Sequence, residues 1–197
     1  MLFGHIKVNS SKMKEFQIEA AHLLCHLFPK KYFHFEEKEQ PDLQFEESNI
    51  GVEITSVNDQ NFMEATSLLK QNTELNTKRK IISKKGVQVG KGFVISKVFC
   101  AEDTELLITK AIRKKQTNSC NYKKFKYNEL FIKSDFNIDF RLCQNLQKCF
   151  FEKSGREFFF DLIYILNNLY LYMISKDDIE IITIDEKTMK EILSFEA

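Results

Sequence analysis

Hydrophobic residues recur at helical spacing in several stretches of the chain. The first stretch has an apolar stripe formed by Phe16, Ala20, Leu23, Leu24 and Leu27. This spacing predicts a helix that begins after a Ser10 or Ser11 cap and ends near Leu27, before Pro29. The same criterion predicts the remaining helices, over residues 58–76, 102–116, 140–151 and 186–195.

Shorter apolar runs bounded by turn residues predict the strands. These runs cover residues 32–35, 43–45, 50–55, 129–133, 158–166, 170–175 and 179–184. Turns at Glu47–Asn49 and Asn167–Asn168 join two pairs of them into hairpins, and residues 83–97 form a hairpin or a mobile loop. Strands and helices mix without a strict βα alternation, which predicts an α/β fold with a central mixed β-sheet flanked by helices.

Composition agrees with one globular domain. The chain has 197 residues, of which 43% are hydrophobic and 29% are charged. These values exclude the disordered, collagen-like and disulfide-scaffold classes. We predict a single domain over residues 1–197, with a C-terminal extension (residues 135–197) of β-hairpin, strand and helix.

The lack of a recognisable signal peptide and the pattern of the cysteines predict a cytoplasmic protein. The N-terminus lacks the pattern of a signal peptide, and the apolar stretches are too short to span a bilayer. We therefore expect no membrane partner. The five cysteines are odd in number and form no CxxC pair, so we expect reduced thiols.

Charge is distributed unevenly although the net charge is only +1. Residues 36–53 contain seven acids and one base, whereas residues 76–97 and 110–126 each contain seven bases and no acid. Solvated loops and helix faces are the usual explanation of such runs. The alternative is that the basic blocks bind phosphates beside a metal-binding carboxylate cluster.

Two carboxylates in the acidic segment are the candidates for chemistry. Asp42 follows Pro41 at the start of a strand, and Glu53 lies in the apolar run IGVEIT. A carboxylate inside an apolar strand is costly to bury unless it is paired, hydrogen-bonded or bound to a metal. A hairpin would place the two side by side, as suits Mg²⁺. The alternative is that Asp42 caps a turn and Glu53 pairs with a lysine at a sheet edge.

The order of these features resembles the PD-(D/E)xK nuclease superfamily. A helix, a strand, Pro41-Asp42 at a second strand and Glu53 near the end of a third carry the resemblance over residues 11–134. It implies a restriction-endonuclease-like core and hydrolysis of phosphodiester bonds, most often in DNA. It also implies that Asp42 and Glu53 hold Mg²⁺ or Mn²⁺, with Glu19 of the first helix completing the site.

The motif lysine is the point of departure from the family. Thr55 stands at its position, and some branches of the superfamily carry the lysine on a neighbouring helix. Lys114 or Lys115 is the expected substitute, in preference to Lys70. Lys115 lies three positions after Ile112, nearer the apolar face, whereas Lys114 shares a face with Lys110.

Basic and aromatic residues of the two positive blocks are candidates for nucleic-acid binding. The expected contacts are Lys84, Lys85, Lys91, Lys110, Arg113, Lys123 and Lys124. Tyr122, Phe125 and Tyr127 alternate with bases, a pattern that fits stacking on nucleobases and core packing equally well.

Other motifs are weaker. His22 and His26 lie one helical turn apart, but no supporting Cys or His cluster favours a metal site. The glycines between Gly86 and Gly92 have the wrong spacing for a phosphate-binding loop.

Two functions remain from the sequence. The first is a metal-dependent DNA endonuclease, with a context in host defence or mobile elements implied only by the family. A chain of this length would dimerise to cut both strands, or act with a protein partner in a larger system. The second, supported by Thr55, is an inactive nucleic-acid-binding or protein-interaction module on the same fold.

Overall fold

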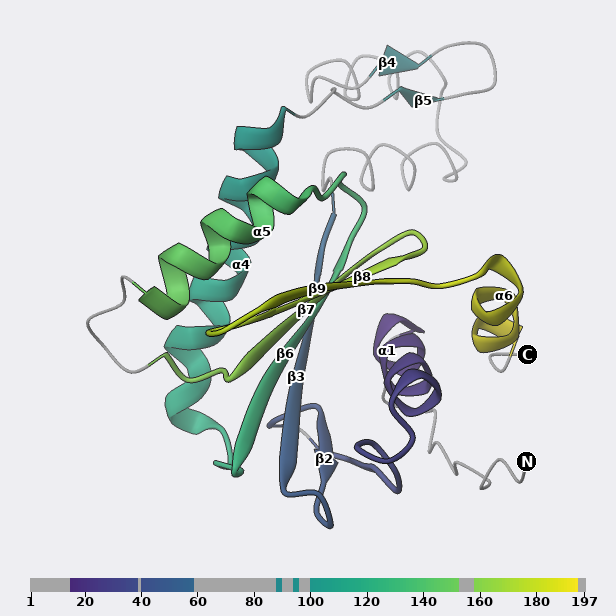
Figure 1. Ribbon diagram of the computed structural model, residues 1–197, viewed down its shortest axis with the longest axis vertical. Helices are drawn as coiled ribbons and strands as arrows, with labels where there is room; N and C mark the ends of the chain where they lie inside the picture. Colours follow the sequence, from purple (N-terminus) through teal and green to yellow (C-terminus); the bar gives the residue numbers. More distant parts are fainter. Residues whose placement is uncertain are drawn as a thin grey trace, which may run out of the picture.

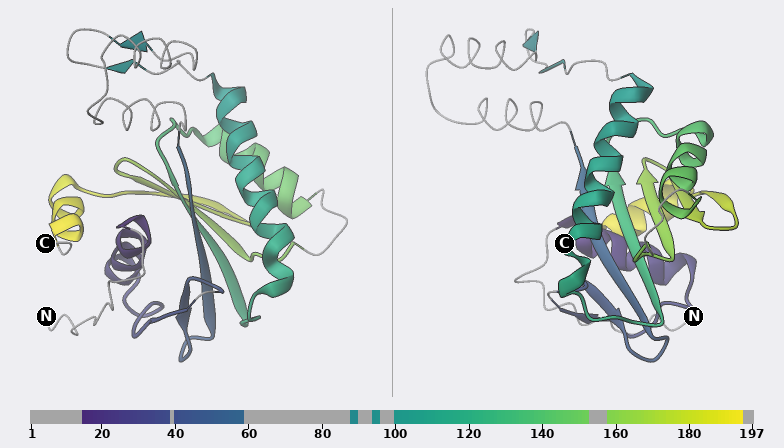
Figure 2. Two further views of the ribbon diagram at one scale, coloured as in Figure 1. Left: turned by 180° about the vertical axis from the view of Figure 1, so that it is seen from behind. Right: turned by 90° about the vertical axis from the view of Figure 1, so that its left-hand side faces the viewer.

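The centre of the molecule is a twisted, seven-stranded mixed sheet with the order β1-β2-β3-β6-β7-β8-β9 (Figure 1). The computed structural model describes residues 15–38, 40–58, 88–89, 94–95, 100–152 and 158–194. Helices lie on both sides of the sheet (Figure 2). The predicted α/β class, with a mixed sheet flanked by helices, is confirmed.

The strands of the large sheet are β1 (Glu36–Glu37), β2 (Leu43–Phe45), β3 (Ile50–Val57), β6 (Tyr127–Ser134), β7 (Leu162–Asn167), β8 (Tyr170–Ser175) and β9 (Ile179–Thr183). A separate antiparallel pair is formed by β4 (Gln88–Val89) and β5 (Val94–Ile95). The described helices are α1 (Glu15–Leu27), α4 (Ala101–Asn118), α5 (Phe140–Gln147) and α6 (Glu186–Ser194), with a 3₁₀ turn at Ser119–Asn121 and a π-helical turn at Lys148–Glu152.

Three parallel strands form the middle of the sheet. β3 pairs with β6 and β6 pairs with β7 in parallel, while the flanking pairs are antiparallel. Parallel neighbours need a crossover connection, and α4 and α5 lie in the connections that follow β3 and β6. Helix α4 packs against β3, the strand of the large sheet that precedes it in the chain.

The two faces of the sheet carry separate hydrophobic clusters. Helices α1 and α6 cover one face, and α4 and α5 cover the other (Figures 1 and 2). Side chains alternate along β3, so that Val52 and Ile54 pack with Leu24 of α1, whereas Val57 packs with Ile112 of α4. Because residues two apart share a face, Glu53 lies on the α4 side.

Turn residues appear where the sequence predicts them. Asn49 ends the β2–β3 turn and Asn168 lies in the β7–β8 turn, with φ angles of 54° and 52°. Asparagine tolerates this left-handed conformation better than most residues.

Two predicted strand segments are wrong. Residues 32–35 form no strand, because His34 has a φ of 51° and Tyr32 turns into the core to meet Glu129. Residues 158–161 precede β7 instead of belonging to it, because the Phe159 amide donates to the Gln116 side chain of α4 at 3.0 Å. Strand β1 (Glu36–Glu37) is not among the predicted strands, whereas the other described strands of the large sheet and the described helices match their predicted positions to within a few residues at each end.

Other sequence predictions have different outcomes. The predicted helix over residues 58–76 lies outside the described residues, and of residues 83–97 only the β4 and β5 pairing is described. The five cysteines are free thiols, as predicted. None of the described helices is long and apolar enough to cross a membrane.

Candidate functional site

The β2–β3 hairpin places the two predicted carboxylates opposite one another. Leu43 pairs with Val52 in the antiparallel register, and one further step along both strands brings Asp42 to Glu53. Residues opposite each other in such a pair are about 5 Å apart at Cβ. The hairpin therefore makes neighbours of two residues eleven positions apart.

Asp42 is held by contacts from two elements. Its Oδ2 accepts a hydrogen bond from the Ile54 amide at 2.7 Å, and its Oδ1 accepts one from the Gln17 side chain of α1 at 2.7 Å. The first contact fixes the carboxylate to β3, and the second fixes it to the helix. Asp42 is thus oriented at the edge of the sheet.

Glu53 is buried with one oxygen engaged and the other without a partner. Only 5% of the residue is exposed. Its Oε1 accepts hydrogen bonds from Lys115 and, at 3.1 Å, from the Tyr122 hydroxyl. Its Oε2 is buried and has no hydrogen-bond partner among the described residues. Leaving a buried acceptor unsatisfied is costly, so this atom is the strongest indication of a ligand site.

Helix α4 brings Lys115 to Glu53. Ile108 and Ile112 form the buried stripe of this helix, and Lys115, three positions after Ile112, continues it. The Lys115 side chain is 20% exposed and forms an ion pair with Glu53. Lys114 is exposed. Of the two lysines that the sequence left open, the structure therefore brings Lys115 to the carboxylate, while Thr55 lies two residues further along β3.

Tyr122 is a site residue that the sequence analysis did not identify as one. It lies just after the 3₁₀ turn that follows α4, with its ring 5.8 Å from that of Phe159 in an edge contact. Burial and the negative charges of Glu53 and Asp42 raise the pKa of its hydroxyl. The hydroxyl therefore stays protonated and donates to Glu53. Its position before the apolar Phe125 gave no signal of this role.

Gly51 allows the site to close. A Cβ atom at this position would lie 2.6 Å from Phe125 Cδ2 and 2.7 Å from Pro41 Cγ. Phe125 is buried, so it has little room to move. The absence of a side chain at Gly51 lets the segment after α4 pack directly on the hairpin that carries Asp42 and Glu53.

Glu19 lies on the other face of the sheet. It is 3% exposed and forms an ion pair with Lys133 of β6, a strand in which Phe131 packs with the α1 cluster. The structure therefore does not bring Glu19 together with Asp42 and Glu53 as a third ligand. Gln17, two residues earlier on α1, is the helix residue that contacts Asp42.

The donor set fits a divalent ion that is held by two carboxylates. No group of three or more His, Cys, Asp or Glu within the described ranges is placed to hold a metal, and this includes His22 and His26. Mg²⁺ is commonly bound through one or two carboxylates, with waters and substrate phosphates as its other ligands. Among the described residues, Asp42 and the unpartnered Oε2 of Glu53 are the candidate ligands.

Exposed bases lie on the same segment as Lys115. Lys110, Arg113, Lys123 and Lys124 are all exposed. Lys123 also forms an ion pair with Glu46 of the hairpin turn at 2.5 Å. The other three predicted contacts, Lys84, Lys85 and Lys91, lie outside the described residues. Tyr122 and Phe125 serve the site and the core respectively, whereas Tyr127 is 44% exposed.

A second buried carboxylate, Glu129, lies beside a cavity of about 690 Å³ on the α1 face. Its oxygens are both engaged, one by Lys31 at 2.8 Å and the other by the Tyr32 hydroxyl. Tyr32 and Tyr164 share a further hydrogen bond at 2.6 Å. This cavity thus has a satisfied network at its floor, in contrast to the Glu53 site.

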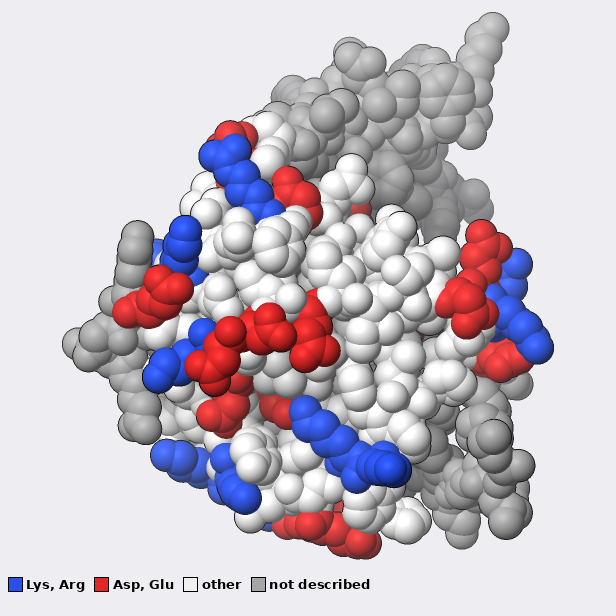
Figure 3. Space-filling view, in the orientation of Figure 1, with Lys and Arg blue, Asp and Glu red and all other residues white. Residues whose placement is uncertain are grey.

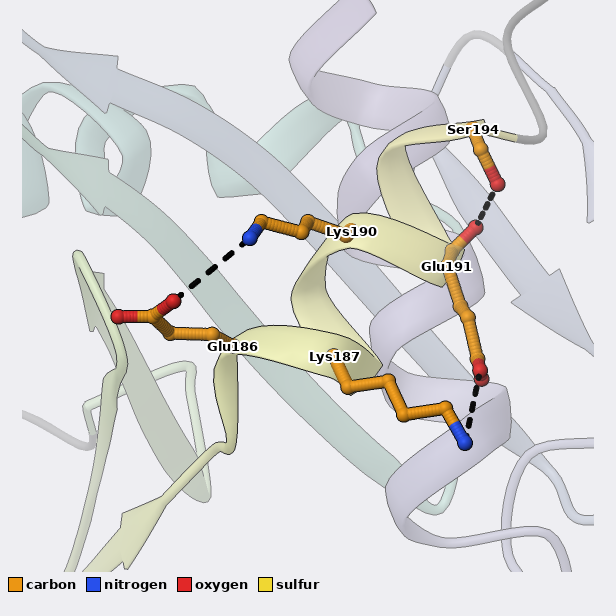
Figure 4. Close-up of a pocket in the computed structure, with 5 residues that line it drawn as sticks. All are labelled: Glu186, Lys187, Lys190, Glu191 and Ser194. Atoms are coloured by element: carbon orange, nitrogen blue, oxygen red, sulfur yellow. Dashed lines mark hydrogen bonds and ion pairs between the residues drawn. The ribbon is translucent and has the colours of Figure 1, made fainter.

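The remaining surface offers little that favours a ligand. A hollow beside α6 is lined by that helix alone, and its charged side chains pair with one another at i,i+4 spacing (Figure 4). On the face shown in Figure 3, acidic and basic side chains both lie around a broad uncharged area. Among the described residues, none that lines the α6 hollow has a buried polar atom without a hydrogen-bond partner.

Comparison of the chain with protein-family models, curated proteins and solved structures returned no match.

Proposed function

We propose that this protein is a metal-dependent nuclease that hydrolyses phosphodiester bonds, with DNA as the first substrate class to test. The observation that carries the proposal is the state of Glu53. This carboxylate is buried opposite Asp42, with a lysine and a tyrosine on one oxygen and no partner for the other among the described residues. A divalent cation is the ligand that satisfies such an oxygen pair.

In this proposal Asp42 and Glu53 hold Mg²⁺ or Mn²⁺. Bound there, the ion would supply charge neutralisation at the phosphate and a more acidic attacking water. Gln17 and the Ile54 amide keep Asp42 in place, while Tyr122 does the same for Glu53. Such supporting contacts tune ligands of a metal and are themselves worth roughly 10–100-fold in affinity.

Lys115 is the residue that would contact the reacting phosphate. Its ammonium lies at Glu53, and an ammonium at this position can donate to a phosphoryl oxygen whose charge grows in the transition state. The exposed bases at Lys110, Arg113 and Lys124 would bind the strand on either side. Their contribution is electrostatic, so binding would weaken with salt.

The element order supports the resemblance to the PD-(D/E)xK superfamily. Helix α1, the β1–β2–β3 antiparallel strands, helix α4 and the parallel strand β6 occur in this order, with Asp42 directly before β2 and Glu53 in β3. This likeness raises the expectation of nuclease activity and does not replace the site argument.

The test is cleavage of plasmid, single-stranded DNA and single-stranded RNA in Mg²⁺ or Mn²⁺. Cutting that disappears with EDTA and in the Asp42→Ala/Glu53→Ala double variant would support the proposal. Glu19→Ala is the matched control, because it removes a buried carboxylate from an ion pair with a lysine on the other face. Equal cutting by wild type and double variant would overturn it.

The second candidate is an inactive nucleic-acid-binding module. The ion pair between Lys115 and Glu53 favours it, because a lysine that only balances a buried carboxylate needs no metal. A folded protein that binds these strands, cuts none of them and takes up no Mn²⁺ would establish this alternative.

A further inference from the structure

Lys115 has donor capacity that an arriving anion can use. An ammonium carries three N–H donors on a flexible four-carbon stem. The side chain is 20% exposed, so a phosphate from solvent can reach it. Two exposed bases that directly precede it in the chain, Arg113 and Lys114, attract such an anion to this end of α4.

The same ammonium opposes a cation at Glu53. It lies on Oε1 of the carboxylate whose other oxygen is unpartnered, so a cation at Oε2 would sit within a few ångströms of a positive charge. Like charges at that separation repel strongly in a partly buried site. The protein without substrate therefore offers the cation a carboxylate that is already neutralised.

We infer that Lys115 makes cation binding and phosphodiester binding depend on each other. When a phosphate is present, the ammonium donates to it, and Glu53 becomes available to the cation. When the cation binds first, it releases the ammonium for the phosphate. Coupling of this kind is reciprocal, and each ligand raises the affinity for the other by the same factor. The inference rests on the proposed function and adds regulation of its site.

The first experiment measures Mn²⁺ affinity of the full chain by calorimetry, without nucleic acid. Lys115→Met is expected to bind Mn²⁺ about tenfold more tightly than wild type, because the competing charge is gone. Lys114→Met is the matched control, since it removes a neighbouring positive charge that does not contact Glu53, and its Mn²⁺ affinity should change less than twofold. Unchanged or weaker Mn²⁺ binding by Lys115→Met would overturn the inference.

The second experiment adds a short DNA duplex, with Ca²⁺ as the probe and a gel to verify that the strand stays intact. In wild type the duplex should tighten Ca²⁺ binding about tenfold. In Lys115→Met this tightening should be clearly smaller, because only the direct contact between phosphate and cation remains, while Lys115→Arg, which keeps the charge, should retain more of it. Equal tightening in wild type and Lys115→Met would contradict the mechanism.

Stability gives an independent measurement if Lys115→Met folds poorly. Without Lys115 the Glu53 charge is buried without its ion-pair partner, so Mn²⁺ should raise the unfolding temperature of this variant more than that of wild type. An equal or smaller rise would count against the inference. Failure of the proposed function is distinguishable, because then no Mn²⁺ would bind to wild type, to Lys115→Met or to Lys115→Arg.

Discussion

Glu53 and Glu129 are two buried carboxylates on neighbouring parallel strands, and they differ in how their oxygens are hydrogen-bonded. They are 5% and 2% exposed, and each meets a lysine and a tyrosine. At Glu129 the lysine and the tyrosine take one oxygen each. At Glu53 both donors contact the same oxygen, and the other oxygen has no hydrogen-bond partner among the described residues.

The two carboxylates therefore differ in whether an oxygen remains without a hydrogen-bond partner among the described residues. A buried polar network stabilises a unique core only when every member is satisfied. Lys31 completes the Glu129 network by lying 2.8 Å from the carboxylate and 4.9 Å above the ring of Tyr32. The unpartnered Glu53 oxygen lowers the stability of the folded protein and leaves an acceptor that a ligand can use.

Activity gives the largest expected contrast. Glu53→Gln should lower metal-dependent cleavage at least about 1000-fold, because it removes the anionic oxygens that hold the ion. Glu129→Gln should lower it less than about threefold, since that side chain lies on the other face. Initial rates on plasmid DNA measure both. A comparable loss in the two variants would remove the distinction between the sites.

Stability should show the reverse order. Glu129→Ala breaks a buried ion pair and leaves the Tyr32 hydroxyl without its carboxylate, and it should lower the free energy of unfolding by about 3 kcal/mol. Glu53→Ala also breaks an ion pair but removes the unpartnered oxygen with it, so it should cost less, about 2 kcal/mol without metal. Urea denaturation measures both changes. If Glu53→Ala were the more destabilising variant, the unpartnered oxygen of Glu53 would not be a cost to the stability of wild type.

Gly51 allows the comparison to be sharpened without changing a charge. Gly51→Ala places a methyl group within 2.7 Å of Phe125 and Pro41, and such overpacking should cost about 2 kcal/mol. It should also weaken Mn²⁺ binding, because Pro41 precedes Asp42, while the Glu129 network keeps its contacts. Mn²⁺ calorimetry and urea denaturation test this. Wild-type stability in Gly51→Ala would show that Phe125 can move.

The pH dependence of stability gives the smallest effect. Burial raises the pKa of Glu129, opposed by Lys31 and Tyr32. The folded protein therefore keeps the Glu129 proton to a higher pH than the unfolded chain does. The resulting contribution to the free energy of unfolding is fully present below the unfolded pKa of about 4.3, and it is lost as the pH rises through the raised pKa of the folded protein. Each pKa unit corresponds to about 1.4 kcal/mol.

Glu129→Gln should remove this dependence. The free energy of unfolding of wild type, measured relative to this variant by urea denaturation from pH 4 to pH 7, should fall as the pH rises. A difference that stays constant over this range, or that grows, would show that the carboxylate has an ordinary or lowered pKa in the folded protein.

The sequence determines the hairpin site better than the residues that join it from elsewhere. Alternation along β3 and the turn at Asn49 are local, so the juxtaposition of Asp42 and Glu53 could be predicted. The lysine that replaces the motif lysine could be narrowed to Lys114 or Lys115, and the spacing of Lys115 from Ile112 places it nearer the apolar face. Tyr122 could not be predicted, because its contact with Glu53 joins residues 69 positions apart and depends on how the segment after α4 packs.

Glu19 shows why a residue's role does not follow from its helix position alone. Its carboxylate could face either the sheet edge or the sheet surface, and the choice depends on Lys133, 114 positions later in the chain. The strand predicted over residues 32–35 failed for a similar reason. Tyr32 turns into the core and donates to Glu129, a partner 97 positions away. Strand propensity is a local property and does not include such a contact.

The separation of 62 positions between Glu53 and Lys115 has a consequence for biosynthesis. A chain that has emerged from the ribosome only as far as residue 100 carries both carboxylates, but neither the ammonium nor the Tyr122 hydroxyl. Parallel pairing of β3 with β6 closes a long loop and forms slowly. The arrangement of side chains around Glu53 is therefore completed late in synthesis.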